Sequence, residues 1–251
     1  MKLVLGRRAS MVAVLLGLTG MVGCSEEETG LFILGNVALS APECIARAEG
    51  GSTLLINGLL DVALRPDYEA TLLVGSQLTP RGDKVNLRTE TMITTVTGAE
   101  VHLFTDTGEP DANSPEFTVP ASGVIRPDAS DDAGFGIVTA TLIPAATGIQ
   151  LASELTNRAE IRTRVAQVSV FGKTIGGVEV ETAPHSYVIR VCEGCLISFP
   201  AEAISTQDQS CFGSAGDTGD PPCRLGQDDA VDCRLCSGEN PFCAFPGGVA
   251  P

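Results

Sequence analysis

Between residues 52 and 192 the sequence is a succession of short, β-branched runs separated by Gly, Pro, Asp and Asn. Apolar and polar residues alternate along many of them, as in a strand with one buried face. The pattern predicts strands over 53–64, 68–74, 89–97, 99–105, 116–119, 123–126, 136–143, 161–171, 178–182 and 186–192. Residues 147–157 have helical spacing instead. These runs indicate an all-β fold, and we expect an antiparallel β-sandwich, immunoglobulin-like or related, of about eight to ten strands.

The first 23 residues have the layout of a signal peptide. Lys2, Arg7 and Arg8 form a basic start, and residues 11–23 are apolar or small apart from Thr19. This apolar run is too short to cross the hydrocarbon core as a helix, which takes about twenty residues. We therefore expect an export signal that is removed from the mature protein.

Met21-Val22-Gly23-Cys24, at the end of the signal, resembles the lipobox of bacterial lipoproteins, although that family usually has Leu where Met21 stands. The resemblance implies cleavage before Cys24, lipidation of its thiol and often acylation of the new amino end. Two or three acyl chains make a lasting membrane anchor.

Sorting and tethering follow from the next residues. Lipoproteins retained at the inner membrane commonly have Asp after the acylated Cys, so Ser25 implies the outer membrane. Residues 24–36, which include a run of three Glu, are expected to form an acidic tether. The order of lipobox, acidic tether, Gly-rich β body and Cys-rich end is similar to outer-membrane lipoproteins of Gram-negative bacteria, and no activity carries over from that resemblance.

Cysteines divide the rest of the chain into a β body, 37–198, and a tail, 199–251. The tail is rich in Gly, Pro, Asp and Ser, and it has too few apolar residues to build a core without disulfides. Eight cysteines besides Cys24 indicate up to four disulfides in an exported protein. They are Cys44, Cys192, Cys195, Cys211, Cys223, Cys233, Cys236 and Cys243. Cys44 is far from the others in sequence, and we expect it to pair with Cys192 or Cys195.

Two C-x-x-C pairs, Cys192/Cys195 and Cys233/Cys236, raise the alternative of a zinc site. Zinc-binding pairs of this type are typically about 15 to 20 residues apart. Here the separation is much larger, other cysteines intervene and the compartment is oxidising, so disulfides are expected. A thioredoxin-like redox motif is disfavoured because no βαβ pattern surrounds either pair.

Composition excludes some partners. Residues 24–251 contain 31 acidic and 13 basic residues, a formal charge of −18. Nucleic acid is excluded as a partner, since its binding rests on neutralising phosphates with Lys and Arg. The chain has no Trp and only two tyrosines, Tyr68 and Tyr187. Aromatic carbohydrate platforms and protein hot spots are therefore disfavoured.

Motifs for catalysis or cofactors are absent from the sequence: it has no G-x-S-x-G, H-E-x-x-H, P-loop or G-x-G-x-x-G. With His102 and His185 as the only histidines, a multi-His metal site within one chain is excluded. The acidic loops 106–111 and 128–132 could offer oxygens to Ca²⁺, but they lack the EF-hand order and are interpreted as solvated turns. Arg81-Gly82-Asp83 is interpreted as turn chemistry. We expect no catalytic residues, metal or cofactor.

Two functional hypotheses remain. The first is a lipid-anchored outer-membrane envelope protein with a non-enzymatic binding or structural role, with the membrane as one partner and an envelope or surface protein as another. The second is a lipid-anchored hydrolase or Ca²⁺-dependent binding enzyme whose site is assembled from loop carboxylates in the folded chain.

Overall fold

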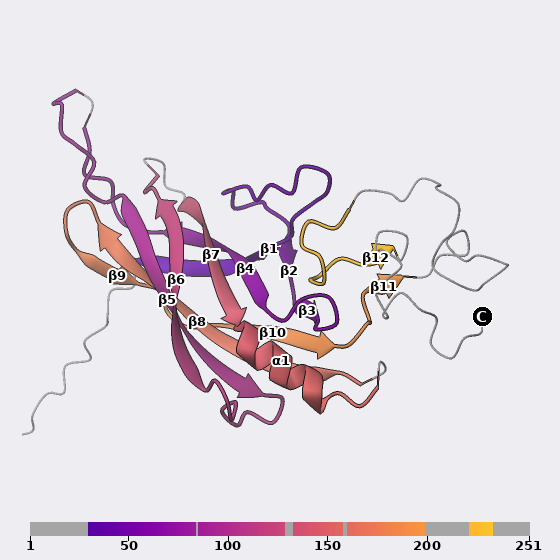
Figure 1. The fold of residues 1–251 in the computed structure, drawn as a ribbon. Coiled ribbons are helices and arrows are strands. Elements are labelled where there is room, and N and C mark those ends of the chain that lie inside the picture. Colours follow the sequence, from indigo (N-terminus) through magenta and orange to yellow (C-terminus); the bar gives the residue numbers. More distant parts are fainter. Residues whose placement is uncertain (1–29, 84, 129–132, 158–159, 199–220, 233–251) are drawn as a thin grey trace, which may run out of the picture.

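The computed structural model describes residues 30–83, 85–128, 133–157, 160–198 and 221–232. Within these residues it contains twelve strands and one helix (Figure 1). The elements are β1 (Leu31–Val37), β2 (Leu54–Leu55), β3 (Gly58–Asp61), β4 (Tyr68–Ser76), β5 (Thr94–Thr105), β6 (Glu116–Ile125), β7 (Gly134–Ile143), α1 (Ala145–Glu154), β8 (Arg162–Thr174), β9 (Glu179–Glu181), β10 (His185–Cys192), β11 (Ile197–Ser198) and β12 (Val231–Asp232).

Ten of the strands form one mixed sheet in the order β2-β1-β4-β7-β6-β5-β8-β10-β3, with β9 paired to β8. Neighbours are antiparallel except β10 and β3, which are parallel. The sheet turns a corner at β6, which pairs with β5 along most of its length, whereas its registered strand pairing with β7 is limited to Ser122 and Thr139. A bridge between Leu31 and Thr182 brings the two sides together again, so the sheet nearly closes as a barrel.

One hydrophobic core fills the inside of this curled sheet. Strand β5 shows how the strands alternate: Val101 and Leu103 are fully buried, while the neighbouring Glu100 and His102 lie on the outer face. The core continues across both sides of the sheet, from Leu72 in β4 to Ile189 in β10. Each fully buried side chain of this size stabilises the fold by about 1.5–3 kcal/mol.

Strand β5 is continuous where the sequence predicted two strands, 89–97 and 99–105. Gly98 marks a bulge in the pairing of β5 with β6 and β8. A Cβ atom on Gly98 would lie 2.3 Å from the Phe171 ring, so the glycine allows the close approach. Pro120 is paired opposite this bulge, a place where a missing N–H is tolerated, and β6 therefore runs through it.

The structure confirms the all-β class. The two packed sheets of an immunoglobulin-like sandwich are not confirmed, because the strands are continuous in one sheet, and the sheet is mixed rather than antiparallel at β3. The helix predicted over 147–157 is present as α1, which begins directly after Pro144 and ends at Glu154. The described residues contain no helix with the length and apolar character that crossing a bilayer requires.

Two boundaries differ from the sequence-based division. Strand β1 starts at Leu31, inside the 24–36 stretch assigned to the tether, because its apolar residues pair with β4 and bury Leu31 and Ile33 in the core. In the tail, residues 221–232, here named the strap, lie against the β body. The Asp61 N–H donates to the Gly226 carbonyl at 2.9 Å, and the Asp228 N–H donates to the Leu59 carbonyl at 2.9 Å. The predicted signal peptide and the rest of the tail lie outside the described residues.

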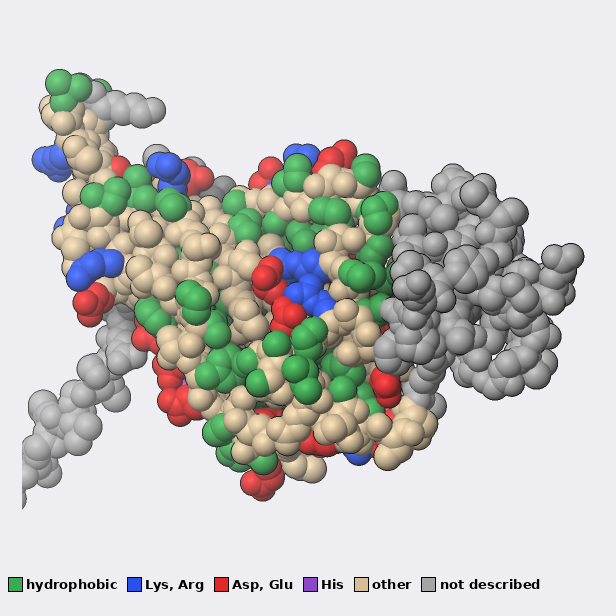
Figure 2. Space-filling view, viewed as in Figure 1, with side chains coloured by type: hydrophobic (Ala, Val, Ile, Leu, Met, Phe, Trp, Pro, Cys, Tyr) green, Lys and Arg blue, Asp and Glu red, His purple; other side chains and the backbone are tan. Residues whose placement is uncertain are grey.

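The link between β4 and β5 projects from one end of the sheet (Figures 1 and 2). We name its described residues, 77–83 and 85–93, the arm. The strap lies toward the opposite end of the molecule, so the two features can be considered separately.

Candidate functional site

Two disulfides are formed by the described cysteines. Cys44 bonds to Cys223, with the Cα atoms 5.3 Å apart, and Cys192 bonds to Cys195, with the Cα atoms 5.9 Å apart. The predicted pairing of Cys44 with Cys192 or Cys195 is therefore wrong. The strap carries Cys223 to the loop that follows β1, while a tight turn after β10 returns Cys195 to Cys192. Cys24, Cys211, Cys233, Cys236 and Cys243 lie outside the described residues.

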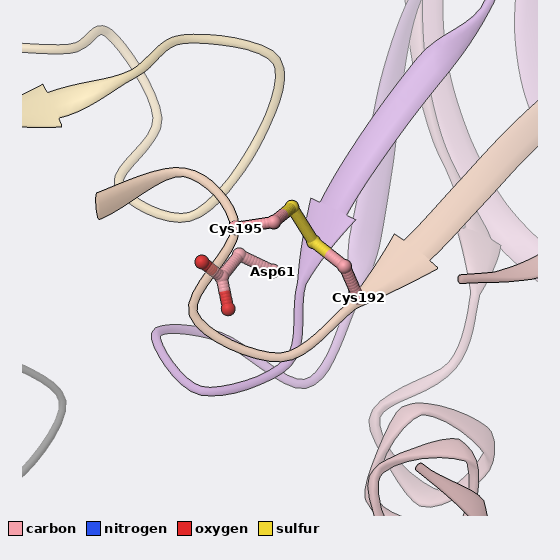
Figure 3. Close-up of side chains that lie close together, drawn as sticks. All are labelled: Asp61, Cys192 and Cys195. Carbon is pink, nitrogen blue, oxygen red and sulfur yellow. A yellow bond between two sulfur atoms is a disulfide. The ribbon is translucent and has the colours of Figure 1, made fainter. Parts of the chain in front are cut away.

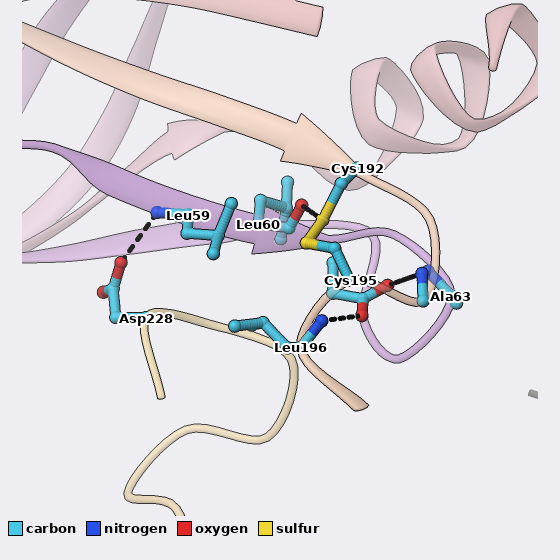
Figure 4. The surroundings of a disulfide bond; sticks show 9 residues. Leu59, Leu60, Ala63, Cys192, Cys195, Leu196 and Asp228 are labelled. Atoms are coloured by element: carbon cyan, nitrogen blue, oxygen red, sulfur yellow. Dashed lines mark hydrogen bonds between the residues drawn. A yellow bond between two sulfur atoms is a disulfide. The ribbon is translucent and has the colours of Figure 1, made fainter. Parts of the chain in front are cut away.

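A buried carboxylate holds the turn that contains the second disulfide (Figures 3 and 4). Asp61, at the end of β3, is fully buried. Its Oδ1 accepts hydrogen bonds from the Gly194 N–H at 2.6 Å and the Ala63 N–H at 3.1 Å, and its Oδ2 accepts one from the Leu196 N–H at 2.9 Å. We name Asp61 with this turn the clasp, because it fastens the end of β10 to the end of β3.

The chemistry open to the clasp is limited by these bonds. Asp61, Cys192 and Cys195 lie close enough together to surround a metal ion. The two sulfurs are bonded to each other, however, and metal binding by Cys needs thiolates. Cys192 is buried and Cys195 is exposed, so Cys195 is the half of the disulfide that an external thiol can approach. In the disulfide form, the clasp is a structural element.

The two tyrosines of the chain meet at the strap end of the core. The Tyr68 and Tyr187 hydroxyl oxygens are 3.2 Å apart, and the Asn36 side-chain amide donates to both at 3.0 Å. The Tyr68 hydroxyl also donates to the carboxylate of Asp228 in the strap, whose two oxygens lie 3.1 and 3.0 Å away. We name Asn36, Tyr68, Tyr187 and Asp228 the tyrosine cluster.

Burial shifts the acidities in the tyrosine cluster. Desolvation, with the nearby Asp228 carboxylate, raises the pKa of Tyr68 far above its usual range, and desolvation also raises the pKa of Tyr187. Desolvation likewise raises the pKa of Asp228, although hydrogen bonds from the Leu59 N–H, Gln227 and Tyr68 act in the opposite direction. Asp228 also has a φ of 64°, a left-handed conformation that is uncommon for a non-glycine residue.

Polar side chains of the strap bind β4 beside this cluster. Gln227 accepts from the Glu69 N–H at 3.0 Å and donates to the Glu69 carbonyl at 2.7 Å, as a strand neighbour would. Arg224 contacts the Glu69 carboxylate at 2.7 Å and the Thr71 hydroxyl at 2.8 Å. These contacts join the strap to β4, in addition to the antiparallel bridge between Gln227 and Leu60 in β3.

Two hollows adjoin the strap end. A small cavity of about 40 Å³ is lined by Asn36, Leu55, Arg224 and Asp228, among others. That volume has room for a few water molecules, whereas small-molecule sites are about 300–1,000 Å³. A more open hollow of about 430 Å³ lies along the loop that follows β1 and is lined by charged residues such as Arg47 and Glu49.

The two histidines lie apart from these features. His102 is on the outer face of β5, with its Nε2 3.1 Å from Glu100 Oε1 and its Nδ1 3.8 Å from Glu116 Oε2. The three side chains are close enough to share a cation, but the carboxylates face opposite nitrogens of the ring. His185 begins β10, and burial lowers its pKa.

The loops that could have offered oxygens to Ca²⁺ do not present an open carboxylate cluster in the described residues. Asp111 is buried, and its Oδ2 accepts from Arg164 Nε at 2.7 Å. Burial alone would raise the pKa of Asp111, but hydrogen bonds from the Asn113 N–H, Arg164 and the Ser114 N–H lower it instead. Most of the 128–132 loop lies outside the described residues.

In Arg81-Gly82-Asp83, the carboxylate is used within the turn. Asp83 accepts from the N–H groups of Val85 and Asn86 at 2.8 and 3.2 Å and from the Asn86 side chain. The Asn86 side chain, followed by these N–H groups, lowers the pKa of Asp83. This geometry agrees with the interpretation of Arg81-Gly82-Asp83 as an ordinary turn.

Sequence reasoning missed the residues around which the structure is organised. Asp61 and Asp228 were not singled out, and the tyrosines were noted only for their small number. Each contact joins residues distant in sequence, such as Tyr68 and Asp228, which are 160 residues apart. One signal was present: Asp61 is a lone acid inside an apolar strand, where a charged group needs a partner.

Comparison with protein-family models, with curated proteins and with solved structures finds no match.

Proposed function

We propose that the chain is a lipid-anchored protein of the outer membrane with a non-enzymatic binding or structural role in the cell envelope. The anchor is Cys24, in the Met21-Val22-Gly23-Cys24 sequence that resembles a lipobox. The β body is then the folded part of the protein that the anchor holds at the membrane. It either binds a partner in the envelope or has a structural role there.

The observation that carries the proposal is the short distance along the chain from the lipidated residue to the folded body. Seven residues, Cys24 to Gly30, precede β1. Fully extended, they span at most about 25 Å, at about 3.3–3.6 Å per residue. A β body that starts so soon after the anchor is held close to the bilayer, which suits a resident envelope protein.

The use of buried charged groups supports a structural or binding role. Asp61 holds the clasp, Asp228 holds the strap, and Asp111 holds Arg164 in β8. Each carboxylate accepts its hydrogen bonds from the chain itself. These groups therefore stabilise the fold, and the outer surface of the domain is the part that would bind a partner.

The test is fractionation of a Gram-negative host that expresses the full chain. The unmodified protein is expected in outer-membrane fractions, with two or three acyl chains on Cys24 by mass spectrometry. Cys24→Ala removes the acceptor thiol and is expected to release the protein into the soluble fraction. Ser25→Asp is the matched control, because it keeps the anchor and should move the protein to the inner membrane.

Two results would contradict the proposal. One is a Cys24→Ala variant that stays with the membranes after a carbonate wash. The other is a native amino end that carries no fatty acid.

A further inference from the structure

The arm begins where the chain enters from the lipidated end. Leu31, the first residue of β1, pairs with Ser76, the last residue of β4. One step further, the Gln77 N–H donates to the Gly30 carbonyl at 2.8 Å. The base of the arm therefore lies directly beside the residue at which the tether joins the sheet.

The tip of the arm presents two apolar side chains to solvent. Val85 is 90% exposed and Leu87 is 91% exposed. Leu87 also has a φ of 51°, a left-handed conformation that is rare for a residue of its size. The Leu87 side chain does not pack in the core, although its backbone conformation is strained. It is therefore free to contact another surface.

Hydrogen bonds hold the arm in shape. The backbones of Asp83 and Arg88 exchange two hydrogen bonds, of 3.0 and 2.8 Å, across the tip. Below them, the Glu90 carboxylate accepts from the N–H groups of Arg81 and Gly82 at 2.9 and 2.7 Å. The two apolar side chains are thus carried on a braced projection.

Basic side chains flank the tip. Arg81 and Arg88 are exposed, and among the described residues neither has an ion-pair partner. They stand out in a mature chain whose formal charge is −18. Figure 2 shows hydrophobic side chains at the far end of the arm and basic ones along its length. This arrangement matches a bilayer interface, because the apolar side chains could contact acyl chains while the Arg side chains contact the lipid phosphates.

A second turn at the same end of the sheet adds to this surface. The N–H groups of Ile175 and Gly176, after β8, donate to the carbonyls of Ile93 and Thr91 in the arm, both at 2.9 Å. Ile175 is 58% exposed. An exposed apolar side chain therefore also lies at the base of the arm.

We propose that the arm is a second membrane contact, in which Val85 and Leu87 insert into the interface of the same bilayer that holds the lipid on Cys24. Arg81 and Arg88 then pair with lipid phosphates. The inference rests on the proposed function for the presence of that bilayer. With an acyl anchor at one point and the arm at another, the β body has a fixed orientation on the membrane.

The chain contains no Trp, so the fluorescence of a single introduced Trp reports only on the surroundings of that residue. Val85→Trp is made in the full, lipidated chain and reconstituted into vesicles of phosphatidylethanolamine with phosphatidylglycerol. We expect blue-shifted emission that is quenched when the lipids carry brominated acyl chains. Ile56→Trp is the matched control: Ile56 is 94% exposed, but it follows β2, which pairs with the opposite end of β1. Its emission should be neither shifted nor quenched.

A second measurement separates the arm from the anchor. In the Cys24→Ala chain, which lacks the lipid, the arm alone should bind the same vesicles weakly. Val85→Asp and Leu87→Asp should each weaken this binding about tenfold or more, the effect expected for losing one buried aliphatic side chain. Neither substitution touches the core, because both side chains are exposed.

The outcomes distinguish the two proposals. If the lipidated Val85→Trp protein sediments with vesicles but its emission is unchanged by brominated lipid, the arm does not insert, and the proposed anchoring stands. If the native chain carries no lipid, the anchoring fails, and vesicle binding by the unlipidated chain still decides the role of the arm. Unlipidated binding that both Asp variants retain would overturn the insertion.

Discussion

At the residue scale, the clasp raises the question of which bond holds the turn after β10. The Cys192–Cys195 disulfide closes a loop of only four residues, for which the chain-entropy relation gives about 2 kcal/mol. Asp61 satisfies three N–H groups, and an unsatisfied buried donor costs about 1–3 kcal/mol. The carboxylate is therefore the stronger of the two restraints.

We predict that Asp61→Ala destabilises the protein more than replacing both Cys192 and Cys195 by Ser. The expected losses in the free energy of unfolding are about 3 kcal/mol or more for the first and about 2 kcal/mol or less for the second. Urea unfolding of the variants measures both. Asp61→Asn is the control, with an intermediate loss, because the amide keeps one accepting oxygen. Equal stability of Asp61→Ala and the double Ser variant would contradict the prediction.

Residues of this kind show where sequence reasoning stops. The sequence predicted a strand over 99–105, which is part of β5, because the pattern of β-branched and turn residues is local. The meeting of Tyr68 with Tyr187 depends on how the whole sheet curls, and the two lie 119 residues apart. A local pattern contains no information on such a contact.

At the scale of elements, the strap is the piece whose position was least expected. A stretch without apolar runs was interpreted as a tail ordered only by disulfides. One disulfide is involved: Cys44–Cys223 joins residues 179 apart, for which the chain-entropy relation gives about 5 kcal/mol. The strap is also held by side-chain bonds of Arg224, Gln227 and Asp228, which add to its short backbone pairing with β3 and β11.

The strands themselves were largely predictable, since their period and their turn residues are local. Strand order was not. Strand β3 lies parallel to β10, although more than a hundred residues separate them in sequence. Because β3 ends at Asp61 and β10 ends at Cys192, their parallel pairing is what assembles the clasp.

Attachment of the strap should depend on pH through Asp228. Its pKa in the folded protein is raised above the ordinary value of 3.8, so the folded state holds the proton more tightly than the unfolded state does. Stability from this group is therefore greatest at low pH and falls as the pH rises through the folded pKa. A tenfold difference in acidity corresponds to about 1.4 kcal/mol.

The variant that isolates this effect is Asp228→Asn, which cannot ionise. We predict that the stability advantage of the unmodified protein over Asp228→Asn is largest near pH 3 to 4 and shrinks toward neutral pH. Other carboxylates, such as Asp111, with its lowered pKa, change stability in the opposite direction. Taking the difference between the two proteins in urea unfolding cancels those contributions. An advantage that grows with pH would contradict the assignment.

At the scale of the whole molecule, the two ends of the sheet have different characters. One end carries the strap, the Cys44–Cys223 disulfide and the tyrosine cluster, all of which hold the chain to itself. The other end carries Gly30, where the proposed tether joins the sheet, and the arm with its exposed apolar tip. Val85 and Leu87 stand on a projection that extends from this second end, so the proposed membrane contact would place that end toward the bilayer.

If anchor and arm act on one bilayer, the tether sets how often the arm meets it. The effective concentration of a tethered group falls roughly as the −3/2 power of tether length once the tether exceeds the span. The seven residues from Cys24 to Gly30 are lengthened about fourfold by inserting a Gly/Ser segment after Glu28. The effective concentration of the arm at the membrane should then fall about eightfold.

We predict that this insertion leaves the proposed lipid anchor and the fold intact but reduces quenching of Val85→Trp by brominated lipids. Sedimentation with vesicles checks the anchor, and an unchanged urea-unfolding midpoint checks the fold. An insertion of equal length after Gly247, near the other end of the chain, is the control and should change neither readout. Quenching that is insensitive to the tether would mean that the arm does not depend on the anchor to reach the bilayer.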